Sequence, residues 1–324
     1  MRILVCGGAG YIGSHMSLAL AECGHTVEVV DDLSTGHAAA VRWGTLHRGD
    51  LGDAAFIGPL LRRIQPDAVM HFAARSLVGE SVADPALYYR NNVAATLTLL
   101  EAMRATVPRP FVFSSTAAVY GEPQCVPIDE NHACAPINPY GVTKHTVERA
   151  LADYWRAYRL PSVSLRYFNA AGAEAQARIG ESHAPETHLI PRVLKSALDG
   201  GGPLTVFGDD YPTADGTCIR DYVHVEDLCQ AHLLALERLC AQPSHEVFNL
   251  GNGRGYSVRE VLQATAEVVG RPVAHRVGPR RAGDPAVLVA DSGRAREILG
   301  WRPRRTDLSA IVDSAWRWHR RPAF

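Results

Sequence analysis

The first half of the chain alternates short apolar runs with segments of helical periodicity. The apolar runs come at regular intervals and predict strands at Ile3–Cys6, Val27–Val30, Ala68–Ala73, Phe111–Ser115 and Ser162–Tyr167. The segments between them predict helices at Ser14–Glu22, Ala54–Ile64, Tyr89–Ala105 and Tyr140–Tyr158. Strands that alternate with helices in this way are typical of a parallel sheet covered by helices on both faces. The pattern therefore predicts an α/β fold with a doubly wound, Rossmann-type sheet.

The regular alternation fades after about Asn169. Loops rich in Gly, Pro and Asp follow at Gly172–Glu186, Gly200–Gly202 and Gly208–Gly216, and such loops often carry binding residues. We expect a Rossmann-type domain at residues 1–170 and a smaller mixed α/β domain at residues 171–324. A segment near residues 222–250 is expected to return to the larger domain.

Two later helices have start signals in the sequence. Ser257 and Glu260 have the spacing of a capping box. Asp291 is expected to cap a second helix, which ends at Leu299 and is followed by Gly300.

Composition and charge exclude several classes of protein. The 324 residues include 33 basic and 34 acidic side chains, with 47% hydrophobic residues, which argues against disorder and against general nucleic-acid binding. Seven scattered cysteines without a C-x-x-C pair predict no disulfide framework and favour a reducing cytoplasm. His183 and His188 share one loop but lack a familiar metal-binding spacing, so no metal site is expected. The first residues do not form a signal peptide or a membrane-spanning segment, so no membrane attachment is expected.

A glycine-rich segment, Gly7-Gly8-Ala9-Gly10-Tyr11-Ile12-Gly13, lies directly after the first predicted strand. Glycines there let the backbone turn sharply, approach a pyrophosphate closely and present helix N–H groups to its charge. Asp31, 18 residues beyond Gly13, can accept hydrogen bonds from ribose hydroxyls and would repel a 2′-phosphate. The segment therefore favours NAD over NADP. Asp50 either faces the adenine or is a solvated loop carboxylate.

Tyr140 and Lys144 are four residues apart in a predicted helix, so their side chains share one face. The chain has only two lysines against 31 arginines, so a lysine here suggests that a compact ammonium is needed. A nearby cation favours the phenolate of a tyrosine, whose ordinary pKa is about 10. Tyr140 could then take the proton of a sugar hydroxyl while hydride leaves the same carbon for NAD. Ser114-Ser115-Thr116, after a predicted strand, either shares this proton path or only caps a loop.

These motifs together resemble the extended short-chain dehydrogenase/reductase superfamily. Further segments are similar to the family of UDP-glucose 4-epimerases, namely Leu165–Asn169, Phe207–Thr213, Asp215–Thr217, Ile219–Val225, Val247–Gly251 and Arg280–Asp284. The resemblance implies inversion at carbon 4 of a UDP-hexose through a transient ketone, with tightly bound NAD and no net redox change. It also implies a homodimer and assigns UDP-sugar binding to the smaller domain.

The resemblance further implies roles for individual residues. Tyr140 would be the base, Thr116 would assist at the 4-hydroxyl, and Lys144 would hold the nicotinamide ribose. The implied cofactor-binding residues are Gly7, Gly10, Tyr11, Ile12, Gly13, Asp31, Asp50, Leu51, Phe72, Asn92, Tyr140 and Lys144. Asn169, Arg220 and Arg281 would lie on the diphosphate side, and Asp284 on the uridine ribose. The other implied substrate-binding residues are Thr116, Tyr140, Tyr222 and Leu288.

Two positions depart from the pattern of many relatives. Ser76 stands where many of them carry a lysine near the cofactor, so NAD retention could differ. Leu288 stands where some relatives carry a bulky tyrosine and others a smaller residue that admits N-acetylated sugars, and leucine is intermediate in size. We therefore expect UDP-glucose and UDP-galactose to be preferred, with some turnover of UDP-N-acetyl-hexosamines.

Alternative functions differ in how well they fit. A sugar-nucleotide 4,6-dehydratase needs an acid and a base directly after the threonine. This chain has Ala117-Ala118 there, and because alanines cannot transfer protons, the sequence argues against dehydration. A 4-epimerase of UDP-pentoses or UDP-uronates remains open, and so does a non-catalytic NAD-binding sensor.

Overall fold

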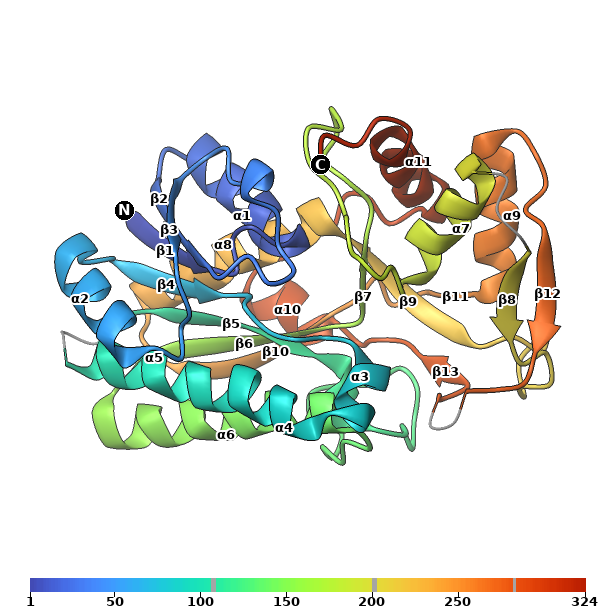
Figure 1. Cartoon of the computed structure of the whole chain (residues 1–324). Coiled ribbons are helices and arrows are strands. Elements are labelled where there is room, and N and C mark those ends of the chain that lie inside the picture. The colour runs from blue at the N-terminus through green and yellow to red at the C-terminus, as the bar shows by residue number, and fades with distance from the viewer. Residues whose placement is uncertain (106–108, 200–202, 282–283) are drawn as a thin grey trace.

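The larger part of the computed structural model is a seven-stranded sheet in which all neighbouring strands are parallel (Figure 1). In sheet order the strands are β10 (His245–Leu250), β6 (Ser162–Tyr167), β5 (Phe111–Thr116), β4 (Ala68–His71), β1 (Arg2–Cys6), β2 (Thr26–Asp31) and β3 (Thr45–Arg48). The strand order reverses between β1 and β4, and doubly wound folds bind ligands outside the carboxyl ends of the strands at this point. The predicted fold class is confirmed.

The structure describes residues 1–105, 109–199, 203–281 and 284–324. The expected loop at Gly200–Gly202 therefore lies outside the described residues, as do Ala282 and Gly283 of the Arg280–Asp284 segment.

Helices cover both faces of the large sheet because its central strands are apolar on both sides. Ile3 and Val5 of β1 face a core that includes α1 (Tyr11–Glu22) and α8 (Val225–Ala241). Leu4 and Cys6 face the opposite core, built on α2 (Ala54–Ile64), α5 (Ala95–Arg104) and α6 (Pro139–Tyr158). This alternation follows from the two-residue period of a strand. Figure 1 shows α5 and α6 below the sheet and α1 and α8 above it.

Several helix and strand boundaries in the structure differ by a few residues from those predicted. The strand predicted to reach Ala73 ends at His71, because the amides of Phe72 and Ala73 both bond to the Cys6 carbonyl. The single helix predicted at Tyr89–Ala105 begins as a π-helical turn, Tyr89–Ala94, and α5 follows it. The short helices α3 (Val78–Ala83) and α4 (Pro85–Tyr88) precede this turn, and the 3₁₀ turns are η1 (Ala38–Ala40) and η3 (Ala117–Tyr120).

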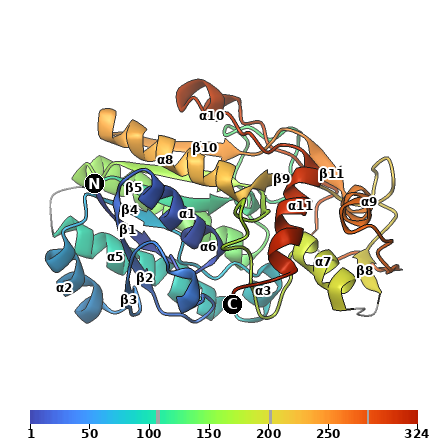
Figure 2. The ribbon, with the colours of Figure 1, turned by 90° about the horizontal axis from the view of Figure 1, so that it is seen from above.

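The remaining elements gather beside the large sheet, as Figures 1 and 2 both show. One sheet contains β7 (Asn169–Ala171), β9 (Ile219–His224), β11 (Gly255–Ser257) and β13 (Val287–Leu288), and a second pairs β8 (Leu204–Phe207) with β12 (His275–Gly278). The helices there are α7 (Leu189–Asp199), α9 (Val258–Val269) and α11 (Leu308–His319), whereas α10 (Gly293–Ile298) packs against β10 and the core of the large sheet. Because β7 pairs with β9, the smaller sheet begins at about the expected boundary, although that boundary itself stays a prediction.

One helix start was predicted correctly, and the cap predicted for the other lies one residue before the observed N-cap. Ser257 and Glu260 form the capping box at the start of α9. The N-cap of α10 is Ser292, which makes no side-chain cap, and Asp291, one residue earlier, accepts the amide of Gly293, the first residue of the helix, at 2.7 Å. Gly300 follows α10 with a φ of +69°, as a helix-terminating glycine should. Within the described residues, none of the helices is both long and apolar enough to span a membrane.

Candidate active site at the carboxyl edge of the sheet

The glycine-rich loop joins β1 to α1 and leaves no room for side chains. Gly7 has a φ of +81°, and a Cβ there would lie 2.5 Å from the Ala73 amide nitrogen. A Cβ on Gly13 would lie 2.1 Å from the Gly7 carbonyl oxygen. Gly10 is the N-cap of α1 and offers no side-chain cap, so the first amides of the helix remain available to an anion. This backbone fits the pyrophosphate of a dinucleotide.

Asp31 lies at the end of β2, directly against the glycine loop. Its Oδ2 accepts the Ala9 amide at 2.9 Å, and its Oδ1 accepts the Leu33 amide at 2.9 Å. Burial raises the pKa of Asp31, and these two backbone hydrogen bonds oppose the rise. Each carboxylate oxygen keeps a lone pair for a ribose hydroxyl, as the sequence prediction requires.

The segment after β4 forms the other side of the loop. Phe72 packs its ring 4.8 Å from the His232 ring. Asn92, in the π-helical turn, is 2% exposed and holds this segment with both ends of its amide. Its Oδ1 accepts the Arg75 amide at 2.8 Å, while its Nδ2 donates to the Arg75 carbonyl and to Thr143 of α6. Asn92 therefore links the segment after β4, which packs beside the glycine loop, to the helix that carries Tyr140.

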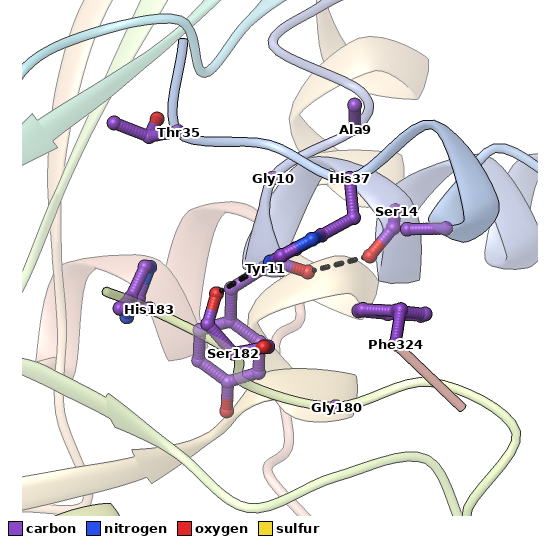
Figure 3. A pocket seen from close by; sticks show the side chains of 11 residues that line it. Ala9, Gly10, Tyr11, Ser14, Thr35, His37, Gly180, Ser182, His183 and Phe324 are labelled. Atoms are coloured by element: carbon purple, nitrogen blue, oxygen red, sulfur yellow. Dashed lines mark hydrogen bonds between the residues drawn. The ribbon is translucent and has the colours of Figure 1, made fainter. Parts of the chain in front are cut away.

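A small pocket adjoins the amino end of α1 (Figure 3). Its lining residues are Ala9, Gly10, Tyr11, Ser14, Thr35, His37, Ala40, Gly180, Ser182, His183 and Phe324. His37 Nε2 lies 3.2 Å from the Ser182 carbonyl oxygen, which joins the two walls of the pocket. The Tyr11 hydroxyl is not free, because it donates to the Gly172 carbonyl at 2.6 Å. Sequence reasoning missed His37, Ser182 and Phe324, since no local motif marks them.

Tyr140 and Lys144 lie in the first turns of α6. The Asn138 side chain caps this helix by accepting the Gly141 amide at 2.9 Å. Lys144 is 3% exposed, its Nζ donates to the Ser114 carbonyl at 2.7 Å, and it lies 4.8 Å from the Phe113 ring centroid. Burial lowers the pKa of Lys144 to about 7, and Glu148 opposes this shift.

Tyr140 is half-buried and faces Thr116, the last residue of β5. Burial raises the pKa of Tyr140, and a hydrogen bond with the Thr116 side chain lowers it. Thr116 Oγ1 also accepts the Ala118 amide at 3.1 Å, so it caps η3 as well as contacting Tyr140. The structure therefore shows Thr116 as a cap that also lies beside Tyr140, and its part in a proton path stays a prediction.

A buried ion pair supports this edge of the sheet. Glu148, one turn after Lys144, contacts Arg166 of β6 at 2.6 Å, and both side chains are nearly inaccessible to solvent. The Ser115 hydroxyl donates to Glu148 at 2.6 Å, and Arg166 donates to the Tyr120 hydroxyl at 2.9 Å. Strands β5 and β6 and helix α6 are thus fixed to one another beneath Thr116 and Lys144.

The residues assigned to the nucleotide lie on the smaller sheet and its loops. Asn169 Nδ2 donates to the Asp221 carbonyl at 3.1 Å. Arg220 of β9 is hydrogen-bonded to Asp284, so the structure brings these two predicted residues together. Arg281 is exposed, and its guanidinium carbon lies 4.0 Å from the Phe207 ring centroid. Tyr222 is 5% exposed and belongs to the apolar core of this part of the chain.

Leu288 lies on β13, opposite Arg220 in the strand register. It packs against the small apolar cluster of Ala117, Val119 and Tyr120 that follows Thr116. The predicted sugar-range residue therefore lies beside the segment that carries Thr116.

The other residues assigned to the site lie either in apolar packing or at the surface. Leu51 is buried in the core under α2, and Ile12 packs on the core under α1. Asp50 is exposed, and its Oδ1 accepts the Gly52 amide at 2.7 Å. Ser76 is exposed, while the neighbouring Arg75 lies 3.6 Å from Glu80.

Comparisons with known proteins show which family the chain resembles over most of its length. The NAD dependent epimerase/dehydratase family matches residues 3–251. A UDP-glucose 4-epimerase of Halalkalibacterium halodurans is 51% identical over 320 residues, which cover 99% of this chain and 96% of that protein. The crystal structure of UDP-glucose 4-epimerase from Brucella ovis in complex with NAD is 50% identical, with a TM-score of 0.95 and 97% of each chain covered. The UDP-Glc/GlcNAc 4-epimerase from Campylobacter jejuni is 41% identical, with a TM-score of 0.86, over 98% of this chain and 99% of that one. With most of its length matched by the family and half its residues shared with such a relative, this chain belongs to the NAD dependent epimerase/dehydratase family.

Proposed function

We propose that this protein is an NAD-dependent 4-epimerase that interconverts UDP-glucose and UDP-galactose. The observation that carries the proposal is the meeting of Tyr140 and Thr116 at the carboxyl end of β5, with Lys144 one turn along α6. Relatives that are half identical to this chain bear the name of that activity. Cytoplasmic UDP-sugars would be its substrates, and a homodimer is its expected state.

The residues that would hold NAD are those of the glycine loop, Asp31 and Lys144. An ammonium has three donors, and Ser114 uses one of those on Lys144, which leaves two for the nicotinamide ribose. When bound there, NAD would supply a hydride acceptor for carbon 4 and, once reduced, a hydride donor for the opposite face of the keto-sugar. The glycine loop and Asp31 would keep NAD in place between turnovers.

Tyr140 would remove the proton of the 4-hydroxyl and return it after the keto-sugar has rotated to present its opposite face. The chain alone does not make Tyr140 a phenolate, because burial raises its pKa. Thr116 opposes that rise and would hold the proton between the sugar hydroxyl and the phenol oxygen. Positive charge brought close to Tyr140 by a bound nicotinamide would lower its pKa further.

The diphosphate would lie against Asn169, Arg220 and Arg281, and the uridine ribose against Asp284. Since Arg220 already donates to Asp284, the uridine diphosphate would meet a guanidinium whose direction is fixed beforehand. Tyr222 would support this face from the core below.

The first test is conversion of UDP-galactose to UDP-glucose by the purified protein without added NAD. Turnover under these conditions would support both the reaction and cofactor retention. Turnover only of a UDP-pentose or a UDP-uronate would move the assignment to the corresponding epimerase. A protein that binds NAD but converts none of these sugars would be the sensor that the sequence left open.

Gly13→Ala is expected to release the cofactor. The new Cβ would overlap the Gly7 carbonyl oxygen, so the loop must open, at a cost of roughly 1–3 kcal/mol, or about 5- to 150-fold in NAD affinity. The measurement is NAD content per chain after purification and denaturation. Gly79→Ala is the matched control, because a Cβ there meets nothing within 4 Å. Equal NAD content in Gly13→Ala and Gly79→Ala would contradict the placement of NAD on this loop.

Leu288→Tyr is expected to narrow the sugar range. The tyrosine ring is larger than the leucine side chain, and beside Ala117 and Val119 it would fill the space into which an N-acetyl group must fit. We expect kcat/KM for UDP-N-acetylglucosamine to fall about tenfold or more, with little change for UDP-glucose. No measurable N-acetylated turnover by the unaltered enzyme, even at high concentration, would remove the second substrate class from the proposal.

A further inference from the structure

A second polar cluster lies in the loop before α7, on residues that the proposed reaction does not use. Glu181, His183, Glu186 and His188 bring one ligand atom each to within 4.8 Å of one another. His183 Nδ1 lies 3.2 Å from Glu181 Oε1 and 3.7 Å from Glu186 Oε2. His188 Nδ1 contacts the same Glu181 oxygen and lies 3.8 Å from Glu186 Oε1. Two imidazoles and two carboxylates therefore point at one place.

The cluster leaves buried polar atoms without hydrogen bonds among the described residues. The Glu186 side chain is 6% exposed, and its Oε2 makes no hydrogen bond, although its Oε1 accepts the Thr187 and His188 amides. His183 Nδ1 is buried and also lacks a properly directed hydrogen bond. Unpaired buried polar atoms are costly, so a group that satisfies both is favoured at this position. His183 Nδ1 at 3.7 Å and Lys195 Nζ at 3.9 Å are the basic groups that face Glu186 Oε2, and both lie beyond hydrogen-bonding distance.

We propose that Glu181, His183, Glu186 and His188 form a binding site for a divalent transition metal ion, Zn²⁺ in the first instance. Two imidazole nitrogens and two carboxylate oxygens are a ligand set that Zn²⁺ accepts, usually as a tetrahedron with bonds of about 2.0–2.2 Å. Ligand atoms of such a tetrahedron are about 3.4 Å apart. The Nδ1 to carboxylate separations of 3.2, 3.7 and 3.8 Å bracket this value. Binding would also move His188 Nδ1 away from Glu181 Oε1 and draw together the more distant ligand atoms, which lie within 4.8 Å of one another.

The site has a closed side and an open side. The Glu181 carbonyl accepts Trp318 Nε1 of α11 at 2.9 Å, which fixes the loop to the body of the protein. The His188 side chain is 47% exposed and gives an ion a path from solvent. His183 also lines the pocket at the amino end of α1, so a bound ion would stiffen that wall of the pocket.

This proposal would overturn the expectation of no metal site. The spacing E-x-H-x-x-E-x-H matches none of the usual metal motifs, because its ligands converge only through the turns of an irregular loop. Its success or failure is independent of the proposed epimerase activity, since none of the four residues was assigned to that reaction.

The test is metal binding by the full chain. The protein is treated with a chelator, dialysed against a limiting Zn²⁺ concentration and analysed for zinc by mass spectrometry. We expect about one ion per chain, and a loss of affinity of about tenfold or more in both His183→Asn and Glu186→Gln. His275→Asn, which changes an exposed histidine of β12 away from the cluster, should keep the ion.

Two further readouts separate this site from other sources of zinc. Co²⁺ in place of Zn²⁺ should give the visible absorption of a tetrahedral N/O site, whereas binding to the exposed Cys23, Cys125 or Cys240 would give thiolate charge-transfer bands. Zn²⁺ should raise the melting temperature of the unaltered chain but not that of Glu186→Gln. No ion bound to the unaltered chain, equal binding by all variants, or thiolate bands alone would each overturn the proposal.

Discussion

Tyr140→Phe is expected to lower kcat for UDP-galactose conversion by about 10²–10⁴-fold while the protein keeps its NAD. Phenylalanine preserves the ring and its packing, which includes the Tyr88 ring 6.5 Å away, and removes only the hydroxyl that would exchange a proton with the sugar. Because Tyr140 has no assigned part in holding the diphosphate, KM should change much less than kcat. The measurement is steady-state kinetics together with NAD content per chain.

Tyr158→Phe is the matched control for this variant. Tyr158 is the last residue of the same helix, its ring is 44% exposed, and it packs against Tyr154 rather than Thr116. It should retain the activity of the unaltered enzyme. A Tyr140→Phe protein within a factor of a few of that activity would show that another group takes the proton.

The expected pH behaviour follows from the surroundings of Tyr140. Burial raises its pKa in the chain without ligand, so the phenolate is scarce at neutral pH. Activity in the unaltered enzyme should therefore rise with pH as the phenol of the bound complex ionises, until a second group limits it. This rise should be absent from whatever residual activity Tyr140→Phe retains.

The parts of the site that the sequence predicts well depend on local spacing. Gly7 and Gly13 belong to one strand–turn–helix unit, and the structure gives each a backbone environment that no other residue could occupy. Tyr140 and Lys144 are one helical turn apart, so their common helix could be predicted from periodicity alone. The predicted consequence for Tyr140 was less accurate. The Lys144 ammonium is bonded to the Ser114 carbonyl, and the pKa of Tyr140 responds to burial and to Thr116.

Contacts between distant segments could not be predicted in the same way. Arg220 and Asp284 are 64 residues apart, and their hydrogen bond depends on how β9 and the loop before β13 meet. The family resemblance implies separate partners for them on the substrate, and in the structure without ligand they are hydrogen-bonded to each other. Asn92 was assigned to the cofactor, but its amide is already hydrogen-bonded to Arg75, Asn91 and Thr143. Its effect on NAD would then come through the position of those segments.

Glu148→Ala is expected to lower the free energy of unfolding by about 3–5 kcal/mol, because it leaves Arg166 charged and buried without a partner. Burial alone would raise the pKa of Glu148, but hydrogen bonds from Arg166 and Ser115, together with the nearby His145 ring at 3.6 Å, hold it at about 2. A carboxyl group with a depressed pKa stabilises the fold above its unfolded pKa of about 4.5, and this contribution is lost as the pH falls toward 2. The variant should therefore show less loss of stability between pH 5 and pH 2, about the window these two values define, than the unaltered chain.

Asp153→Ala separates burial from charge pairing on the same helix. Asp153 lies 3.0 Å from Arg156, but both side chains are more than two-thirds exposed, so removing it should cost less than about 1 kcal/mol. Urea unfolding of the two variants at neutral pH makes the comparison directly. If Glu148→Ala costs no more than Asp153→Ala, the Glu148–Arg166 pair does not anchor α6 to β6.

A large difference would mean that the positions of Ser114, Thr116 and Lys144 depend on an ion pair that touches neither substrate nor cofactor. Glu148→Ala should then also lower kcat at temperatures where the variant is still folded, since Ser115 and Lys144 lose the support of the same carboxylate.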